Sequence, residues 1–207
     1  MNARLLRLDD EATPAQAAQV VQAGGLIIFP TDTVWGLGAD ATNKEAVEQL
    51  RRLKGRSARQ PLTLHLANVE LIQQYCRRLT RQQRRWIERL LPGPYTLILP
   101  AAAGAPQAAV NSAGGVGLRV PDSGSFRRLA SALACPLVAS SVNRSGQPPL
   151  TRLAEIIGLF GAEVELILTS DEPMSGQSST VIELTGSSPQ ALRGRLPQAL
   201  RTDWRAI

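Results

Sequence analysis

The feature that most constrains the fold of this chain is the mixture of short apolar segments with stretches of helical periodicity. Residues 26–29 are typical of a short buried strand, and residues 62–66 alternate with period two, which predicts a strand with one buried face. Predicted strands and helices are mixed along the chain but do not alternate strictly. This pattern favours an α/β (α+β) protein with a twisted mixed sheet and helices packed on it.

Turn and capping residues set the expected element boundaries. Thr13 as a capping residue, followed by Pro14, predicts the start of a helix that stops at Gly24–Gly25. Thr80 and Gln83 form a capping-box pattern, which predicts another helix with Trp86 pointing inward. Residues 31–38 are expected to form a loop. Further strands are predicted over 95–99, 116–120, 137–140, 166–168 and 180–184, and further helices over 44–53, 125–133 and 151–158.

Length and composition limit the classes of protein that the chain can represent. Its 207 residues, 43% of them hydrophobic, can bury one sizeable core, and no stretch approaches the ~20 apolar residues of a membrane span. Residues 1–195 are expected to form one domain and 196–207 a C-terminal tail on the surface. Asp9 and Asp10 come too early for a secretory segment, and Cys76 and Cys135 lack CxxC partners. These features predict a cytoplasmic protein with no membrane partner.

The net charge of +6 favours polyanionic ligands such as nucleotides or RNA, although many basic proteins bind no nucleic acid. Arg81, Arg85 and Arg89, with Arg84 beside them, form a basic stripe opposite Trp86. The stripe can face RNA or simply be a solvated helix face. No interleaved aromatic platform supports specific RNA recognition.

The segment Lys54-Gly55-Arg56 is the strongest candidate for phosphate binding. Two cations two residues apart in an extended segment project from the same side, and Gly55 allows a ligand to approach the backbone. A basic helix end, where cations complement the dipole, explains the same residues. The sequence contains no GxxxxGK[ST], GxGxxG or HExxH motif, so an enzyme that uses nucleotides must hold phosphates with separate side chains and loop amides.

Polar residues also occur within or after predicted strands. Ser141 and Asn143 follow an apolar strand, which suits phosphate or ribose contacts but also ordinary turns. Arg119 lies inside an apolar strand, so it either pairs with an internal acid or binds a substrate carboxylate. His65, the only histidine, points opposite Leu64, and a lone strand histidine is more often passive than catalytic.

Together these segments resemble the YrdC/TsaC family of threonylcarbamoyl-AMP synthases. The resemblance begins at the Phe-Pro-Thr-Asp-Thr-Val-Trp-Gly-Leu-Gly segment, similar to that family's PT(D/E)TVYGLG loop. Matching motifs in family order cover residues 29–38, 54–56, 61–65, 91–96, 117–121, 141–146, 178–182 and 192–193. The resemblance spans nearly the entire chain, and it is to the short, single-domain form of the family.

The resemblance implies a YrdC-like fold, an open twisted mixed β-sheet flanked by helices around a positively charged cavity. It implies synthesis of threonylcarbamoyl-AMP and pyrophosphate from L-threonine, bicarbonate and ATP, with Mg²⁺, for transfer to tRNA by a separate transferase complex. Lys54 and Arg56 would be catalytic through charge. L-threonine would contact Thr33, His65, Arg119, Ala139 and Ser179, and ATP would contact Lys54, Arg56, Gln60, Gly115, Ser141, Asn143, Pro149 and Arg193.

This chain departs from the family pattern at several loop positions, which are Trp35, Ser57, Ala139, Val142 and Ser178. None of these changes removes a charged ligand group. Two other functions remain as alternatives: a non-catalytic RNA-binding protein and a YrdC-like carbamoyl-transfer paralogue. The chain lacks the zinc-finger CxxC pairs expected of that paralogue and keeps both the KxR and the SxN motif. We therefore expect a synthase that works by positioning and preorganised charge, without a dedicated nucleophile or base.

Overall fold

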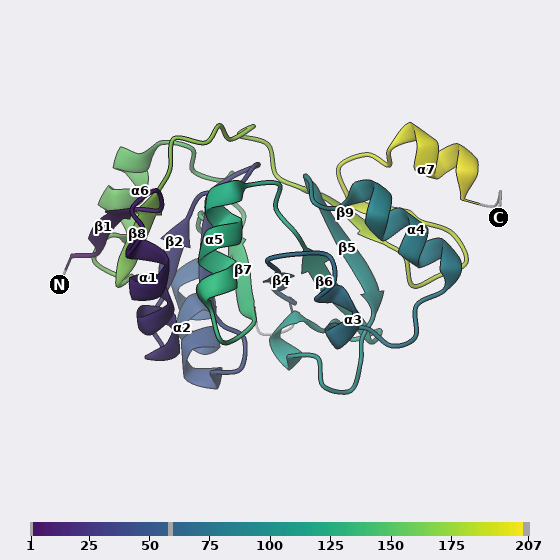
Figure 1. Cartoon of the computed structure of the whole chain (residues 1–207), viewed down its shortest axis with the longest axis horizontal. Helices are drawn as coiled ribbons and strands as arrows, with labels where there is room; N and C mark the ends of the chain where they lie inside the picture. Colours follow the sequence, from purple (N-terminus) through teal and green to yellow (C-terminus); the bar gives the residue numbers. More distant parts are fainter. Residues whose placement is uncertain (1, 58–59, 205–207) are drawn as a thin grey trace.

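A mixed β-sheet runs along the longest axis of the molecule, and β1 (Arg4–Arg7) and α7 (Gln198–Asp203) lie at opposite ends of this axis (Figure 1). The computed structural model describes residues 2–57 and 60–204. The strands are β1 (Arg4–Arg7), β2 (Ile27–Phe29), β3 (Gly36–Asp40), β4 (Thr63–His65), β5 (Tyr95–Pro100), β6 (Gly115–Arg119), β7 (Leu137–Ser141), β8 (Leu166–Thr169), β9 (Thr180–Glu183) and β10 (Gln190–Arg193).

Helices connect most of these strands. They are α1 (Thr13–Gln22), α2 (Lys44–Lys54), α3 (Ile72–Tyr75), α4 (Arg81–Leu90), α5 (Gly124–Ala132), α6 (Leu153–Phe160) and α7 (Gln198–Asp203), with a short 3₁₀ helix η1 (Gln107–Ala109). Within the described residues the ten strands follow the order β1-β8-β2-β3-β7-β4-β6-β5-β9-β10, with parallel and antiparallel neighbours. The predicted fold class, an open mixed sheet flanked by helices, is therefore confirmed.

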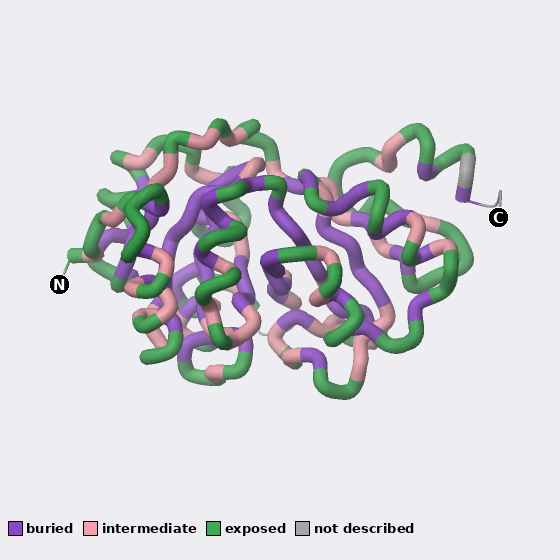
Figure 2. The backbone as a smooth tube through the Cα atoms, in the orientation of Figure 1, coloured by how far each residue is buried: buried purple, intermediate pink, exposed green. Residues whose placement is uncertain are grey.

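Alternate residues of the strands enter two separate hydrophobic cores. In β2, Ile27 and Phe29 pack with residues of α1 and α5, whereas Ile28 belongs to the larger core that includes residues of α2 and α4. Figure 2 shows the backbone of the central strands as buried, with exposed segments on the outer turns of the helices. In β4, Leu64 belongs to the larger core, so its neighbours Thr63 and His65 point to the other face.

The strand β3 was not predicted, since residues 31–38 were expected to form a loop. It pairs antiparallel with β2, with Phe29 opposite Gly36. The ring of Phe29 lies over the glycines, and a Cβ atom on Gly36 would come 2.6 Å from the Phe29 ring. Glycine has low strand propensity, but here it leaves room for a buried ring. The hairpin therefore depends on packing that a local pattern does not reveal.

Part of the predicted surface tail packs on the domain. Leu200 in α7 is fully buried, Trp204 is 6% exposed, and the indole Nε1 of Trp204 donates to the carbonyl of Ser187 at 2.8 Å. These contacts attach residues 198–204 to the segment between β9 and β10. The rest of the predicted tail after Trp204 lies outside the described residues.

Several local predictions are confirmed, with changes of boundary. Thr80 and Gln83 form the capping box at the start of α4, and Trp86 is buried. Thr13 is the first residue of α1 rather than its cap, since Ala12 is the N-cap and makes no side-chain hydrogen bond. α6 lies two residues later than predicted, after the N-cap Arg152. Within residues 2–57 and 60–204, no helix is long and apolar enough to cross a bilayer.

Candidate functional site

A cavity of about 400 Å³ opens on the sheet face that carries His65. Its wall comes from strands β3 to β7, β9 and β10 and from the C-terminal end of α2. The segments that precede β3, β4 and β6 and those that follow β7 and β8 complete the wall. The cavity therefore brings together side chains from Thr31 to Arg193. The predicted site residues on its wall are Lys54, Arg56, Gln60, His65, Gly115, Arg119, Ala139, Ser141, Asn143, Ser179 and Arg193.

Lys54 is the last residue of α2 and is 3% exposed. Its Nζ donates to the Ser141 carbonyl at 2.5 Å and to Asn143 Oδ1 at 2.7 Å. Burial, and then the nearby charge of Arg56, lowers the pKa of Lys54 to about 7. Gly55 follows with φ 63°, in the left-handed region that glycine adopts without strain, and this turn ends the helix.

Arg56 and Arg193 approach the same cavity from distant parts of the chain. Arg56 donates to Ser140 Oγ at 3.1 Å and to the Pro61 carbonyl at 2.6 Å, while Arg193 donates to the carbonyl and Oγ of Ser179 at 2.9 and 3.0 Å. Burial lowers the pKa of both guanidinium groups, and in Arg56 the charges of Arg51 and Arg193 lower it further.

Lys54, Arg56 and Arg193, here called the cationic cluster, share one property. All their hydrogen-bond acceptors named above are uncharged oxygens, and no carboxylate of the described residues forms an ion pair with them. The Nε of Arg56 is also buried without a hydrogen-bond partner. Several positive charges around one space, with donors still free, suit a ligand that carries several negative charges.

Arg119 on β6 is held differently, by a carboxylate and a hydroxyl. Its Nη2 donates to Asp32 Oδ1 at 2.5 Å and to Thr33 Oγ1 at 2.6 Å. Burial lowers the pKa of Arg119, and the charge of Asp32 opposes this shift. We call Arg119, Asp32 and Thr33 the paired arginine centre. Of the two explanations left open for Arg119, the structure supplies internal pairing and also places Arg119 on the cavity wall.

His65 lies beside Arg119 in the β4–β6 register and packs edge-on against Phe29 and Phe126. Burial, and then the charge of Arg119, lowers the pKa of His65 to about 3. The imidazole is therefore neutral at neutral pH. Because a carbonyl only accepts, the contact of Nδ1 with the Thr63 carbonyl at 3.2 Å gives Nδ1 the proton and makes Nε2 an acceptor.

Two predicted site residues do not line the cavity. Thr33 is fully buried, and it reaches the site through its hydrogen bonds to Arg119 and to Thr31, which lies on the wall. Pro149 lies outside the wall because the segment after Gly146 returns to the end of β7, where the Leu150 N–H donates to the Val142 carbonyl at 2.8 Å.

Other polar residues at the site were not predicted. Asp32 pairs with Arg119, and Thr96 on β5 shares a hydrogen bond of 2.9 Å with Ser179 Oγ. Asp32 and Thr96 lie within the family motifs, beside Thr33 and Tyr95. Their polar side chains in these motifs were a signal from which the sequence could have identified them as site residues. Asn111, which also lines the cavity, carries no such signal.

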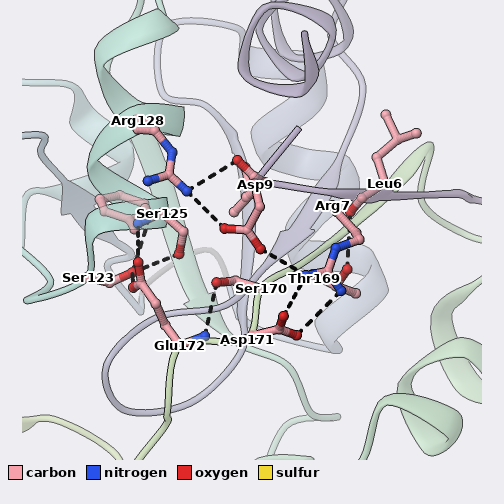
Figure 3. A network of polar contacts seen from close by, with 12 residues as sticks. Leu6, Arg7, Asp9, Ser123, Ser125, Arg128, Thr169, Ser170, Asp171 and Glu172 are labelled. Atoms are coloured by element: carbon pink, nitrogen blue, oxygen red, sulfur yellow. Dashed lines mark hydrogen bonds and ion pairs between the residues drawn. The ribbon is translucent and has the colours of Figure 1, made fainter. Parts of the chain in front are cut away.

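The segment between β8 and β9, residues 170–179, carries Ser178 and Ser179 to the cavity wall. Figure 3 shows how its first residues are anchored: Glu172 accepts from Ser123 Oγ and the Ser125 N–H, both at 2.7 Å, at the start of α5. Asp171 pairs with Arg7 of β1 at 2.6 Å. These contacts fix the start of a segment that crosses from one half of the sheet to the other.

Comparisons with known proteins agree with this architecture. A family model named Sua5/YciO/YrdC, described as "Telomere recombination", matches residues 19–194. A threonylcarbamoyl-AMP synthase of Pyrococcus abyssi is 35% identical over 87% of this chain and 54% of its own length, and one of Cellvibrio japonicus is 32% identical over 73% of this chain and 80% of its own length.

A solved structure, P. abyssi Sua5 complexed with L-threonine, superposes with a TM-score of 0.88 and 31% identity. The match covers 99% of this chain and 61% of that chain. The chain thus spans between half and two thirds of the P. abyssi protein, and four fifths of the C. japonicus relative. The breadth of the match to the family model identifies the chain as a member of the Sua5/YciO/YrdC family.

Proposed function

We propose that this chain is an L-threonylcarbamoyladenylate synthase that converts L-threonine, bicarbonate and ATP to threonylcarbamoyl-AMP, pyrophosphate and water. The observation that carries the proposal is one cavity with two kinds of anion site: the cationic cluster and the paired arginine centre. The names of the relatives and the threonine-bound P. abyssi structure support the same assignment. We assign the activity to residues 1–195.

The amino acid fits the paired arginine centre. The Nε of Arg119 is buried and has no hydrogen-bond partner, so a ligand carboxylate would satisfy it. His65 offers a neutral acceptor nitrogen beside Arg119, and Ser179 offers a hydroxyl on the wall. This arrangement suits one small ligand with a single carboxylate and its own hydrogen-bond donors.

The triphosphate fits the cationic cluster. A carbamate oxygen, formed from the threonine amine and bicarbonate, attacks the α-phosphorus, and the bond to the pyrophosphate oxygen breaks. Two anions meet in this step, so Lys54, Arg56 and Arg193 would lower their repulsion and stabilise the negative charge on the leaving pyrophosphate. Because His65 is neutral and has a very low pKa, the reaction relies on positioning rather than on a histidine base.

Magnesium would enter as the complex with ATP. Within residues 2–57 and 60–204, no group of three or more His, Cys, Asp or Glu residues could hold a metal ion. Asp32, the carboxylate at the site, is already paired with Arg119. Since Mg²⁺ commonly keeps several waters and binds through substrate phosphates, the protein would recognise the complex by its phosphates.

The decisive assay is pyrophosphate release with complete substrates and with threonine and bicarbonate omitted one at a time. A synthase releases pyrophosphate only when both are present, and it forms a product in which AMP and threonine are joined. A carbamoyl-transfer paralogue would not join threonine to AMP. Release that ignores threonine, or ATP binding without turnover, would contradict the proposal.

We further propose that the enzyme acts in the cytoplasm, binds RNA through its basic surface and supplies threonylcarbamoyl-AMP to a separate tRNA transferase complex. Arg81 and Arg84 of α4 are exposed, whereas Arg89 lies over the ring of Trp86 with its guanidinium carbon 5.0 Å from the ring centroid. A contact with RNA phosphates through this stripe would weaken steeply with salt, and the double variant Arg81→Ala, Arg84→Ala would lower the salt slope. Unchanged RNA binding in that variant would remove the support for this surface.

A further inference from the structure

Asp32 has no role in the proposed reaction as described above. Its carboxylate meets Arg119 Nη2 at 2.5 Å, yet Asp32 is not among the residues that line the cavity. The side chains of Arg119 and Asp32 are 5% and 13% exposed. Asp32 therefore acts on the site from behind the arginine.

The hydrogen-bond directions around Arg119 are defined by the buried turn 31–34. Thr31 donates its hydroxyl to the Val34 carbonyl at 2.7 Å, so Thr31 Oγ1 accepts from the Thr33 hydroxyl at 3.1 Å. The Thr33 oxygen in turn accepts from Arg119 Nη2. The hydroxyl proton of Thr33 is thus committed to Thr31, and the Thr33 hydroxyl has no proton left for a substrate.

Both N–H groups of Nη2 are accordingly used, one by Asp32 and one by Thr33. An arginine has five N–H donors in a fixed plane. Holding Nη2 in two places fixes that plane, so the donors that remain point in fixed directions. The Nε of Arg119 is a buried donor without a partner.

Asp32 is itself held by the backbone. Its carbonyl accepts from the Ser175 N–H at 3.0 Å, and the Thr33 carbonyl accepts from the Gly176 N–H at 2.8 Å. Both donors lie in the segment 170–179, whose first residues are anchored to α5 and β1. The backbone that carries the Asp32 carboxylate is therefore fixed independently of Arg119.

We propose that Asp32 is a positioning residue for the amino-acid substrate: it fixes the plane of the Arg119 guanidinium to which the substrate carboxylate binds. The inference rests on the proposed function and deepens it. Asp32 also supplies the negative charge that keeps a buried arginine in place near the like charge of Arg193. Without Asp32, Arg119 would be free to turn toward other acceptors.

The test measures binding of L-threonine and of ATP, separately, to the full chain by titration calorimetry. Asp32→Ala should weaken threonine binding by about tenfold or more, the effect of losing one charged hydrogen bond, and change ATP binding less than about twofold. Asp32→Asn keeps the acceptor oxygen without the charge and should lose less. Asp122→Asn, an exposed aspartate just after β6, is the matched control and should bind both ligands like the wild type.

A double-variant comparison separates positioning from a general structural effect. In an Arg119→Lys background, Asp32→Ala should weaken threonine binding no further, because Asp32 acts through the guanidinium. Equal threonine affinity in the wild type and in Asp32→Ala overturns the inference and leaves the synthase proposal intact. If Asp32→Ala does not fold, the same measurements on Asp32→Asn decide. A lower melting temperature of Asp32→Asn, with an unchanged ratio of threonine affinity to ATP affinity, overturns the inference. Failure of the wild type to bind threonine overturns both proposals.

Discussion

Two groups of residues on the cavity wall hold positive charge in opposite ways. The paired arginine centre gives Arg119 an acid, Asp32, whereas the cationic cluster gives Lys54, Arg56 and Arg193 only uncharged acceptors. A buried cation without an acid destabilises a fold, since burial penalises its charged form. Lys54, which is 3% exposed, carries this cost most fully, whereas Arg56 is half-buried and Arg193 is exposed. An anionic ligand offsets the cost at the cationic cluster, and Asp32 already offsets it at the paired arginine centre.

This contrast matches the charges of the proposed ligands. A half-neutralised arginine suits one carboxylate, and an uncompensated cluster suits a triphosphate with several charges. The two groups also have different roles: Asp32 orients the donors of Arg119, whereas the cationic cluster attracts an anionic ligand. Variants of the cationic cluster and of the paired arginine centre should consequently differ in stability, in turnover and in their response to pH.

The largest expected effect is at the paired arginine centre. Arg119→Met should lower the free energy of unfolding by about 3–5 kcal/mol, because it leaves Asp32 buried without its partner, and it should abolish threonine-dependent pyrophosphate release. Urea unfolding and the release assay check both. The double variant Arg119→Met, Asp32→Asn should recover most of the stability but no activity. If Arg119→Met were as stable as the wild type, the pairing of Arg119 with Asp32 would not stabilise the fold, and the contrast with the cationic cluster would fail.

Variants of the cationic cluster should lose activity but keep the fold. Lys54→Met and Arg56→Ala should each lower kcat by about 10²–10³-fold, the effect of removing a preorganised charge near a developing negative charge. Their melting temperatures should equal or exceed that of the wild type, because a penalised cation is gone. Arg52→Ala, an exposed position on the same helix, is the control and should be active. Near-normal turnover in Arg56→Ala would contradict the role of the cluster.

The pH response should reveal Lys54. Its pKa is about 7 in the folded protein and 10.5 in the unfolded chain, so the unfolded chain binds more protons between these values and stability should rise with pH across that window. ATP affinity should fall over the same range, by at most about tenfold for each pH unit, as Lys54 loses its charge. Calorimetry of ATP binding in buffers of different ionisation enthalpy should detect proton uptake. Lys54→Met should remove it, and equal proton uptake in that variant would exclude Lys54 as its source.

His65, beside the paired arginine centre, should respond on the acidic side instead. His65 has a pKa of about 3 when folded and 6.5 when unfolded, so stability should fall as pH drops from 6.5 toward 3, by at most about 1.4 kcal/mol per pH unit. Carboxylates also titrate in this range, so the signal is the difference between His65→Phe and the wild type in urea unfolding. Identical slopes in the two proteins would show that His65 is not buried as a neutral group.

Local patterns predicted much of this structure but not all of it. The helices α2, α4 and α5 and the strands β4 to β9 follow from apolar spacing and capping residues, which act within a few positions. The strands β1 and β10 escaped prediction because they lie at the sheet edges, where most side chains are exposed and no alternation is required. α7 was missed for a similar reason, since a six-residue helix is held by Trp204 rather than by its own pattern.

By itself, the sequence determined the mixed sheet, the family resemblance and the lysine and arginine side chains that reach the cavity, because these depend on local periodicity and on motifs. Only the tertiary structure decided how those side chains are held. It paired Arg119 with Asp32 from a distant loop, left the cationic cluster without an acid, and moved Thr33 behind the arginine. Such pairings depend on distances between strands far apart in the chain, and burial then changes the charge state of each group.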